Sequence, residues 1–212
     1  MDKKILTASV FKVLSKEYGS LKPMLRYRDC FQLLISVILS AQTTDEQVNR
    51  ATPQLFRHYP DAEALSMAEQ EHVEQLIHGV GFFRVKARHI IAASRAIHDQ
   101  YRGNVPSEME ILTRLPGVGR KSANVVRGFC FGKPAIIVDT HFMRVCRRVG
   151  LTDSNNPEMI ESQVRELLER EKHTRFSMAV NRHGRVCCNA RKPECYACSI
   201  EGLCSFTGKV TG

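Results

Sequence analysis

The stretch LPGVGRKSANVV, residues 115–126, joins a glycine-rich turn to an apolar helical pattern and places a lysine at the junction. Gly117 and Gly119 permit positive φ angles and leave backbone N–H groups unshielded. Successive N–H groups at a helix N-terminus form a binding site for an anion. The spacing of a Walker A loop is absent, and no strand pattern precedes the turn. The stretch therefore predicts a helix-hairpin-helix over about 107–130 that grips a phosphate through its backbone.

Lys121 lies in the first turn of the helix that follows this hairpin. A cation at the positive end of a helix dipole is placed unfavourably, so a purely structural role explains it poorly. Two roles stay open on local grounds. The amine could contact a phosphate, or it could act as a nucleophile whose neutral form is favoured by the helix end and by partial burial.

Asp139 is the candidate partner of this lysine, in the sequence Val138-Asp139-Thr140-His141. Aspartate is a favoured N-cap, which gives it a structural explanation. It also follows an apolar run that would bring it out of the core. A carboxylate near Lys121 could accept the proton of the amine and stabilise a cationic sugar.

Helical periodicity dominates the rest of the chain. The one β-like run, 135–138, is short and follows Pro134, so we interpret it as a buried connector. Ser107 and Glu110 predict a capping box, and Asn156-Pro157 predicts a helix start. The sequence therefore predicts an all-α fold, with helices over 5–17, 31–41, 70–78, 84–99, 120–130, 139–148, 158–171 and 174–184.

Composition narrows the class of protein. The chain has 212 residues, 43% of them hydrophobic and 25% charged, with a formal net charge of +9. No apolar run approaches the ~18 residues that a membrane span needs. The N-terminus has no signal or transit pattern, so we expect a cytoplasmic protein. A basic surface attracts polyanions, of which nucleic acids are the abundant ones in the cytosol; a basic protein without such a partner is the alternative.

The C-terminal region holds five of the eight cysteines, four of them with the spacing Cys188-x6-Cys195-x2-Cys198-x5-Cys204. Such a group in a chain without a secretory signal favours a metal over disulfides. One C-x2-C pair with two more distant cysteines suits a [4Fe–4S] cluster, and zinc is the alternative. Cys187 is adjacent to Cys188, and neighbouring side chains point apart, so we leave it out of the predicted ligand set.

The loop between the first two of these cysteines carries two adjacent cations, Arg191 and Lys192. A loop pinned by a metal could hold both side chains toward a phosphate backbone. A solvated loop explains them equally well.

Taken together, these motifs resemble endonuclease III, the bifunctional branch of the helix-hairpin-helix DNA glycosylases. The resemblance rests on LPGVGRKSANVV, on VDTHFMRV at 138–145 and on the cysteine spacing, in that order. It extends to LSAQTTD at 39–45 and to GVGFF at 79–83. The ordered set covers nearly the whole chain and is far more specific than any one motif.

The resemblance implies two helical domains with double-stranded DNA bound in the cleft between them. A six-helix domain with the hairpin would span 22–132. A second domain, 1–21 plus 133–212, would carry a [4Fe–4S] cluster in the loop 188–204, held by the four cysteines named above. We expect a monomer that works on the DNA of a bacterial or archaeal nucleoid.

Site residues also follow from the resemblance. A damaged pyrimidine is flipped into a pocket, Gln42 fills the vacated space, and Phe82 wedges the opposite strand. The family often has leucine at that last position. The backbone around the hairpin would hold a phosphate, through Gly117, Val118, Gly119 and Arg120. Lys121 would attack C1′, expel the base and form a Schiff base, Asp139 would support this step, and β-elimination would cut the strand.

Two alternatives remain from the sequence. A mismatch-type glycosylase of the same fold would remove a base without cutting the strand; the presence of Lys121 disfavours it. A non-catalytic DNA-binding module could keep the hairpin and cluster. The joint presence of Lys121 and Asp139 disfavours that, because binding needs neither as a pair.

Overall fold

The protein is described by a computed structural model covering residues 2–19 and 21–210. These residues form α-helices and short 3₁₀ turns and contain no β-strand, so the predicted all-α fold is confirmed. None of the described helices combines the length and apolarity of a membrane span. The expected second domain, 1–21 plus 133–212, includes four residues outside the described part of the chain: Met1, Ser20, Thr211 and Gly212.

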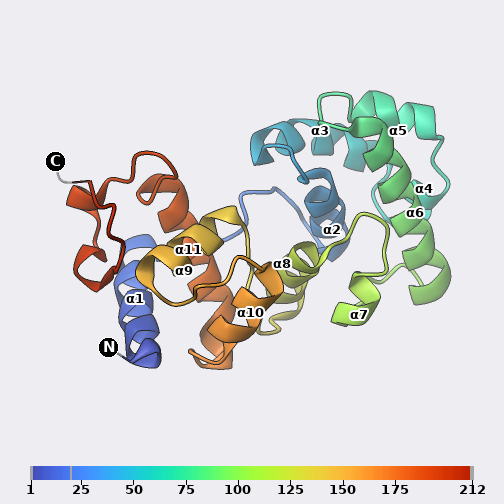
Figure 1. Cartoon of the computed structure of the whole chain (residues 1–212). Helices are drawn as coiled ribbons and strands as arrows, with labels where there is room; N and C mark the ends of the chain where they lie inside the picture. The colour runs from blue at the N-terminus through green and yellow to red at the C-terminus, as the bar shows by residue number, and fades with distance from the viewer. Residues whose placement is uncertain (1, 20, 211–212) are drawn as a thin grey trace. The chain divides into compact units, whose positions relative to one another are not determined.

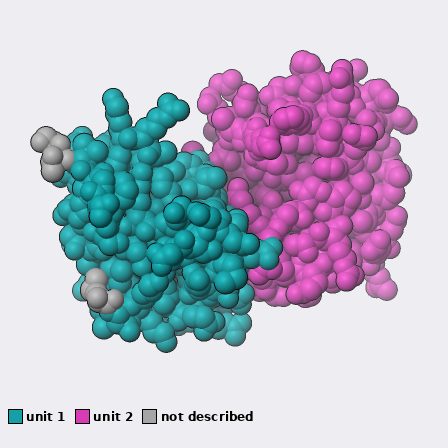
Figure 2. Space-filling view, viewed as in Figure 1, with its two compact units in different colours: residues 1–22, 134–212 teal, residues 23–133 magenta. Residues whose placement is uncertain are grey.

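The chain divides into two compact units, coloured separately in Figure 2. We call residues 23–133 the hairpin unit and residues 1–22 plus 134–212 the cysteine unit. Each division falls one residue after the boundary expected from the sequence. The first unit is continuous in the chain, whereas the second combines both ends of the chain.

The hairpin unit is built around one buried helix, α2 (Cys30–Leu39). Every residue of α2 from Phe31 onward is buried, as expected for a helix that is apolar on all sides. Three longer helices pack against it: α3 (Asp45–His58), α6 (Phe83–Tyr101) and α8 (Arg120–Phe131). The short helices α4 (Ala62–Ser66) and α5 (Gln70–Leu76) pack on α6, and α7 (Met109–Leu112) packs on α8 (Figure 1).

Helix α3 was not predicted by the periodicity, because Pro53 lies inside it. A proline within a helix costs about 3 kcal/mol through a lost backbone donor and a steric clash. A capping box between Thr44 and Gln47 stabilises the helix start. Full burial of a side chain such as Leu contributes roughly 1.5–3 kcal/mol. One face of α3 therefore offsets the proline by burying Val48, Thr52, Leu55 and Phe56.

The predicted capping box of Ser107 and Glu110 is wrong. Helix α7 begins after Glu108 and has no side-chain cap. The Ser107 hydroxyl instead donates to Glu108 Oε1 at 2.8 Å and accepts from Lys133 Nζ at 2.6 Å. The Ser107 hydroxyl is therefore bonded to the adjacent Glu108 carboxylate and does not cap α7, as the sequence pattern had predicted it would.

The cysteine unit consists of α1 (Lys3–Tyr18), α9 (Thr140–Val149), α10 (Pro157–Arg165) and α11 (His173–Val186). Helix α11 packs against both α1 and α9, and its Phe176 lies in the core with Phe142 of α9. The predicted helix starts at Asp139 and at Asn156-Pro157 are confirmed. The helix predicted over 158–171 ends early, at Arg165, and the 3₁₀ turn η1 (Arg170–Lys172) lies between α10 and α11. Two further 3₁₀ turns, η2 (Cys195–Ala197) and η3 (Glu201–Leu203), follow α11.

Candidate functional site

The hairpin turn requires glycine at one of its two positions. Gly117 has a φ of 79°, and a Cβ there would lie 2.8 Å from Ile38 Cγ2 and 3.1 Å from His89 Cβ. The turn is therefore pressed against α2 and α6. Gly119 has an extended backbone with open space where a Cβ would be. Close packing thus explains why residue 117 is a glycine, whereas no neighbouring protein atom requires a glycine at position 119.

Helix α8 begins at this turn without a side-chain cap. Its N-cap is Gly119, which offers no side-chain acceptor to the first-turn N–H groups. Val118 is buried and its N–H donates to Leu115 O, so this N–H is not available to an anion. An uncapped helix N-terminus carries partial positive charge and favours an anion. The turn therefore has the chemistry of a phosphate site.

Lys121 is the second residue of α8, and its side chain is exposed. The partial burial expected from the sequence is wrong, because the first turn of α8 lies at the surface of the hairpin unit. Lys121 belongs to the hairpin unit and Asp139 to the cysteine unit. That the two side chains face each other stays a prediction.

Two loops of the hairpin unit carry the residues predicted to enter DNA. Gln42 and Phe82 both have left-handed backbones, with φ of 52° and 59°. Left-handed residues other than glycine are uncommon, and they are held there by their surroundings. Gln42 is exposed, and Phe82 is 66% exposed, which is unusual for so large an apolar side chain.

Asp139 is held by two side chains that the sequence did not single out. Its Oδ1 accepts from the Phe142 N–H at 2.8 Å, which caps α9. Its Oδ2 accepts from Asn181 Nδ2 and lies 3.9 Å from Arg185 NH2. Asn181 and Arg185 are one turn apart on α11, and Arg185 Nε also donates to Asn181 Oδ1 at 2.9 Å. The i, i+4 spacing of an amide and a cation was the available signal, but nothing in the sequence linked it to Asp139.

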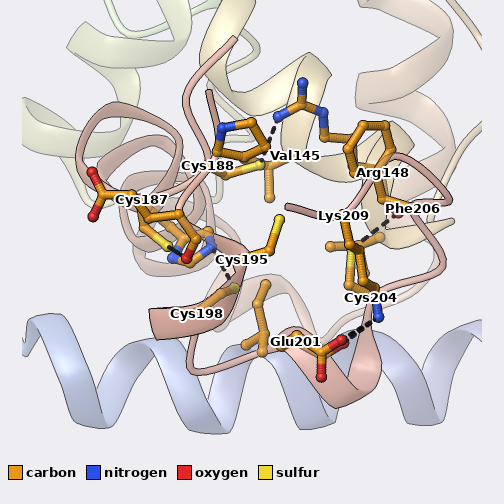
Figure 3. A pocket seen from close by; sticks show the side chains of 15 residues that line it. Val145, Arg148, Cys187, Cys188, Cys195, Cys198, Glu201, Cys204, Phe206 and Lys209 are labelled. Carbon is orange, nitrogen blue, oxygen red and sulfur yellow. Dashed lines mark hydrogen bonds and ion pairs between the residues drawn. The ribbon is translucent and has the colours of Figure 1, made fainter. Parts of the chain in front are cut away.

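The structure brings the four predicted cysteine ligands together. Cys188, Cys195, Cys198 and Cys204 line one cavity, with the Cys195 sulfur directed toward its middle (Figure 3). Burial raises the pKa of the Cys198 and Cys204 thiols. Positive charge from a metal would reverse such a shift, because the thiolate is the ligand form. The cysteine-rich segment thus forms a site able to hold a metal.

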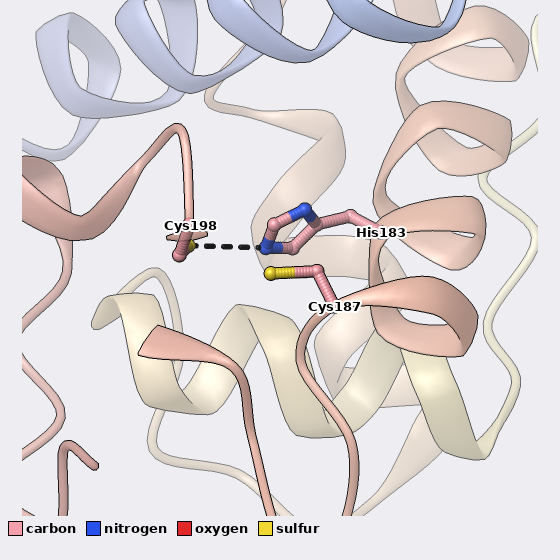
Figure 4. A group of neighbouring side chains, drawn as sticks. All are labelled: His183, Cys187 and Cys198. Atoms are coloured by element: carbon pink, nitrogen blue, oxygen red, sulfur yellow. Dashed lines mark hydrogen bonds between the residues drawn. The ribbon is translucent and has the colours of Figure 1, made fainter. Parts of the chain in front are cut away.

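A second, smaller group overlaps this one (Figure 4). The donor atoms of His183, Cys187 and Cys198 all lie within 4.8 Å of one another. His183 is buried, its Nε2 lies 3.5 Å from Cys198 Sγ, and its Nδ1 lies 3.0 Å from the Tyr18 hydroxyl. Burial raises the pKa of Cys187 to about 12. The sequence prediction left Cys187 out of the ligand set, and no motif in the sequence pointed to His183.

Two arginines of α9 hold the start of the cysteine segment. Arg144 Nε donates to Cys188 O at 2.9 Å, and Arg148 donates to Asn189 O at 2.7 Å and Ala190 O at 2.9 Å. Arg148 also stacks on the Phe206 ring, 4.4 Å from its centroid. Arg191 and Lys192 follow directly and are exposed. The backbone of the basic loop is therefore fixed while its two cations remain in solvent.

Comparisons with known proteins agree on one family. Residues 35–170 match the HhH-GPD superfamily of base excision DNA repair proteins. Endonuclease III of Synechocystis sp. is 44% identical, over 95% of this chain and 93% of the relative. A solved structure of a trapped endonuclease III–DNA covalent intermediate has a TM-score of 0.91 and 36% identity, with 96% of each chain covered. A thermostable thymine-DNA glycosylase is more distant, at 25% identity and a TM-score of 0.84, covering 96% of this chain and 95% of that one.

Proposed function

Because the chain belongs to the HhH-GPD superfamily of base excision DNA repair proteins, and within it to the endonuclease III family, we propose that it is a bifunctional DNA glycosylase. It removes oxidised or otherwise damaged pyrimidines from duplex DNA and then nicks the abasic site. The observation that carries the proposal is Lys121, an exposed amine in the first turn of an uncapped helix that follows a phosphate-type turn.

The hairpin supplies the grip on DNA. Backbone N–H groups of the turn, those of Gly117, Gly119 and Arg120, donate to one phosphate, which sets the position of the duplex without reading its sequence. The Val118 N–H takes no part, because it donates to Leu115 O. Arg191 and Lys192 contact the phosphate backbone from the basic loop. Such contacts position the target nucleotide, so that a lesion flipped from the duplex meets the amine.

Lys121 then performs both chemical steps. Its neutral amine attacks C1′ of the damaged nucleotide, the C1′–N glycosidic bond breaks, and the base leaves with the electron pair and takes up a proton. The nitrogen then loses a proton, the C1′–O4′ bond breaks, and O4′ takes the electron pair and a proton, which leaves a Schiff base (iminium) between C1′ and Lys121. The iminium acidifies the 2′ proton, whose removal expels the 3′ phosphate by β-elimination.

Asp139 supports the first step through its charge. A carboxylate close to the sugar stabilises the positive charge that develops as the base departs, and it can accept a proton from the lysine. Asn181 and Arg185 hold Oδ2, while the N-cap bond occupies Oδ1. The carboxylate therefore has a fixed orientation.

Gln42 and Phe82 act on the duplex around the flipped base. The exposed amide of Gln42 fills the vacated space, and the exposed ring of Phe82 wedges beside the opposite strand. The left-handed backbone at each residue presents its side chain at the tip of a turn.

We further propose that the metal group is a [4Fe–4S] cluster held by Cys188, Cys195, Cys198 and Cys204. Four cysteines that line one cavity match the four thiolates of such a cluster. When bound, the cluster would tie four points of one segment together and so stiffen the basic loop. Zinc held by His183, Cys187 and Cys198 is the second candidate, because those three donors lie close enough for a single ion.

Two serine variants separate these candidates. If the cluster is correct, Cys188→Ser loses the visible absorption of an iron–sulfur centre and most of the bound iron, whereas Cys187→Ser keeps both. The opposite pattern, with zinc in the purified protein and its loss in Cys187→Ser, would support the smaller site. Metal analysis of each purified variant, with its absorption spectrum, gives the answer.

Borohydride trapping tests the reaction itself. The protein is incubated with a duplex that carries an oxidised pyrimidine, and borohydride is added to reduce any Schiff base. A covalent adduct that disappears in Lys121→Ala supports the bifunctional enzyme. Release of the base without an adduct would instead indicate a monofunctional glycosylase, and binding without either would indicate a DNA-binding module.

We propose that the enzyme acts as a monomer on nucleoid DNA in the cytoplasm.

A further inference from the structure

Lys86 is a buried cation that the reaction above does not use. It lies in the first turn of α6 and is only 5% exposed. Its Nζ donates to Leu39 O at 2.8 Å and to Thr43 Oγ1 at 2.7 Å. Burial lowers the pKa of Lys86 to about 8, and desolvation is the cause of that shift.

This position is costly for a lysine on two counts. The ammonium loses its hydration, and it lies at the positive end of a helix dipole. An apolar side chain of similar length would avoid both costs. An ammonium group, unlike an apolar side chain, can donate hydrogen bonds. The two that Lys86 donates go to Leu39 and Thr43, in another segment of the chain.

The two segments that Lys86 connects carry Gln42 and Phe82. We call residues 40–44 the Gln42 loop and residues 79–82 the Phe82 loop. Leu39 ends α2 just before the Gln42 loop, Thr43 lies within it, and Lys86 follows the Phe82 loop by one helical turn. The lysine therefore bonds to both ends of the loop that presents Gln42.

The two loops also touch directly. A Cβ at Gly81 would lie 3.3 Å from Thr43 Oγ1 and 3.5 Å from Gln42 O, so the Phe82 loop lies against the Gln42 loop there. Thr43 Oγ1 is the same atom that accepts from Lys86. One hydroxyl thus takes part in the lysine bond and in the contact between the loops.

We propose that Lys86 is a positioning residue that fixes the Gln42 loop against the Phe82 loop, so that both side chains enter a duplex as one rigid unit. The inference rests on the proposed function, because it assigns these loops to DNA. Gln42 and Phe82 hold uncommon backbone conformations, and the lysine bonds oppose their relaxation in the free protein. The effect is on binding and base unstacking, not on the attack by Lys121.

The test uses a duplex with a tetrahydrofuran abasic analogue, which the amine cannot open, opposite 2-aminopurine. Anisotropy gives the Kd, and 2-aminopurine fluorescence reports unstacking of the opposite base. Loss of a charge-assisted contact predicts about tenfold weaker binding for Lys86→Met, which corresponds to ~1.4 kcal/mol. The rise in fluorescence at saturating protein should also fall.

A double-mutant cycle links the effect to the loop contact. Thr43→Val removes the hydroxyl, so it should weaken binding in the same direction, and the double variant should lose less than the sum of the two singles. Lys133→Met is the matched control. Lys133 also donates to a carbonyl and a hydroxyl, but both belong to Ser107, which is in neither loop, so its variant should bind as wild type does.

The outcomes divide cleanly. If Lys86→Met and Thr43→Val are folded and bind with wild-type Kd and fluorescence, while the wild type binds and forms the borohydride adduct, the inference alone is overturned. If the wild type neither binds nor forms an adduct, the proposed function fails and the inference with it. Should Lys86→Met not fold, Thr43→Val decides by itself, because it leaves the buried cation in place.

Discussion

At the scale of single residues, Asp139 has two tasks that substitution can separate. Asparagine caps a helix as well as aspartate, so Asp139→Asn should keep the cap and lose only the contacts of Oδ2 with Asn181 and Arg185. Asp139→Ala removes the cap and should cost about 1 kcal/mol. Both variants lose the charge that supports departure of the base, so both should form adduct much more slowly. Urea unfolding and single-turnover trapping of the two variants test this; equal trapping by wild type and Asp139→Asn would leave Asp139 with only its capping role.

Asn181 is the residue whose importance only the structure reveals. Its amide holds Asp139 Oδ2 and accepts from Arg185 Nε. Asn181→Ala should leave the carboxylate free to rotate about its capping bond. We expect slower single-turnover trapping, by about tenfold for one lost hydrogen bond to a charged group, with unchanged affinity for DNA. A change in Kd without a change in trapping rate would contradict this orienting role.

The buried Lys86 also gives a pH dependence of stability. Its pKa is about 8 in the folded protein, against 10.5 for a fully hydrated lysine such as that of the unfolded chain. The unfolded chain therefore binds more protons between these values, so the contribution of Lys86 to stability rises as pH increases from about 8 to 10.5. Wild type should gain free energy of unfolding relative to Lys86→Met between about pH 7.5 and pH 10. Groups common to both proteins cancel in that difference, which urea unfolding at the two pH values measures.

At the scale of elements, the two hairpin glycines should respond differently to alanine. Gly117→Ala places a Cβ 2.8 Å from Ile38 at a φ of 79°, so it should cost about 1–3 kcal/mol of stability. Gly119→Ala meets no protein atom within 4 Å and should fold normally. Its methyl group would nevertheless stand where a phosphate approaches the start of α8, so DNA affinity should fall. Thermal unfolding and anisotropy on the two variants distinguish a packing glycine from a binding glycine.

Helix α3 shows where sequence patterns fail at this scale. Periodicity and end signals predicted the helices with long apolar faces, because those faces dominate the local pattern. Helix α3 was not predicted because Pro53 lies within it, although the burial of Leu55 and its neighbours offsets the free-energy cost of the proline. The capping box predicted at Ser107 and Glu110 does not form, because the Ser107 hydroxyl donates to the adjacent Glu108 instead of capping the helix. Both errors arise from interactions that a local pattern does not record.

Residues of the candidate site divide in the same way. The cysteine spacing predicted a group of four cysteines, and these four line one cavity because the short segment that carries them folds back on itself. His183 and Asn181, by contrast, reach their partners from α11 across a packed interface with no sequence motif. No motif in the sequence distinguishes Lys86 from the other cations of the chain, because its burial and its bonds to Leu39 and Thr43 arise only in the folded structure.

At the scale of the whole molecule, the net charge of +9 should govern affinity through salt. Each phosphate contact releases counterions and contributes about −0.9 to the slope of log K against log salt concentration. Arg191→Ala with Lys192→Ala should therefore make the slope shallower by ~1–2 and weaken binding to all duplexes alike. Titrations across salt concentrations test this. A loss confined to damaged duplexes would instead mean that the basic loop reads the lesion.

The order in which the chain is made has a consequence for the cysteine unit. Helix α1 buries Leu6, Val10 and Leu14 in a core that it shares with α11, the last α-helix of the described chain. The continuous hairpin unit is synthesised entirely between the two. At roughly 5–20 residues per second, the apolar face of α1 waits on the order of ten seconds or more for its partner on the ribosome. Helix α1 thus emerges well before the helix that covers it, and in that interval its exposed apolar face is a binding site for a chaperone.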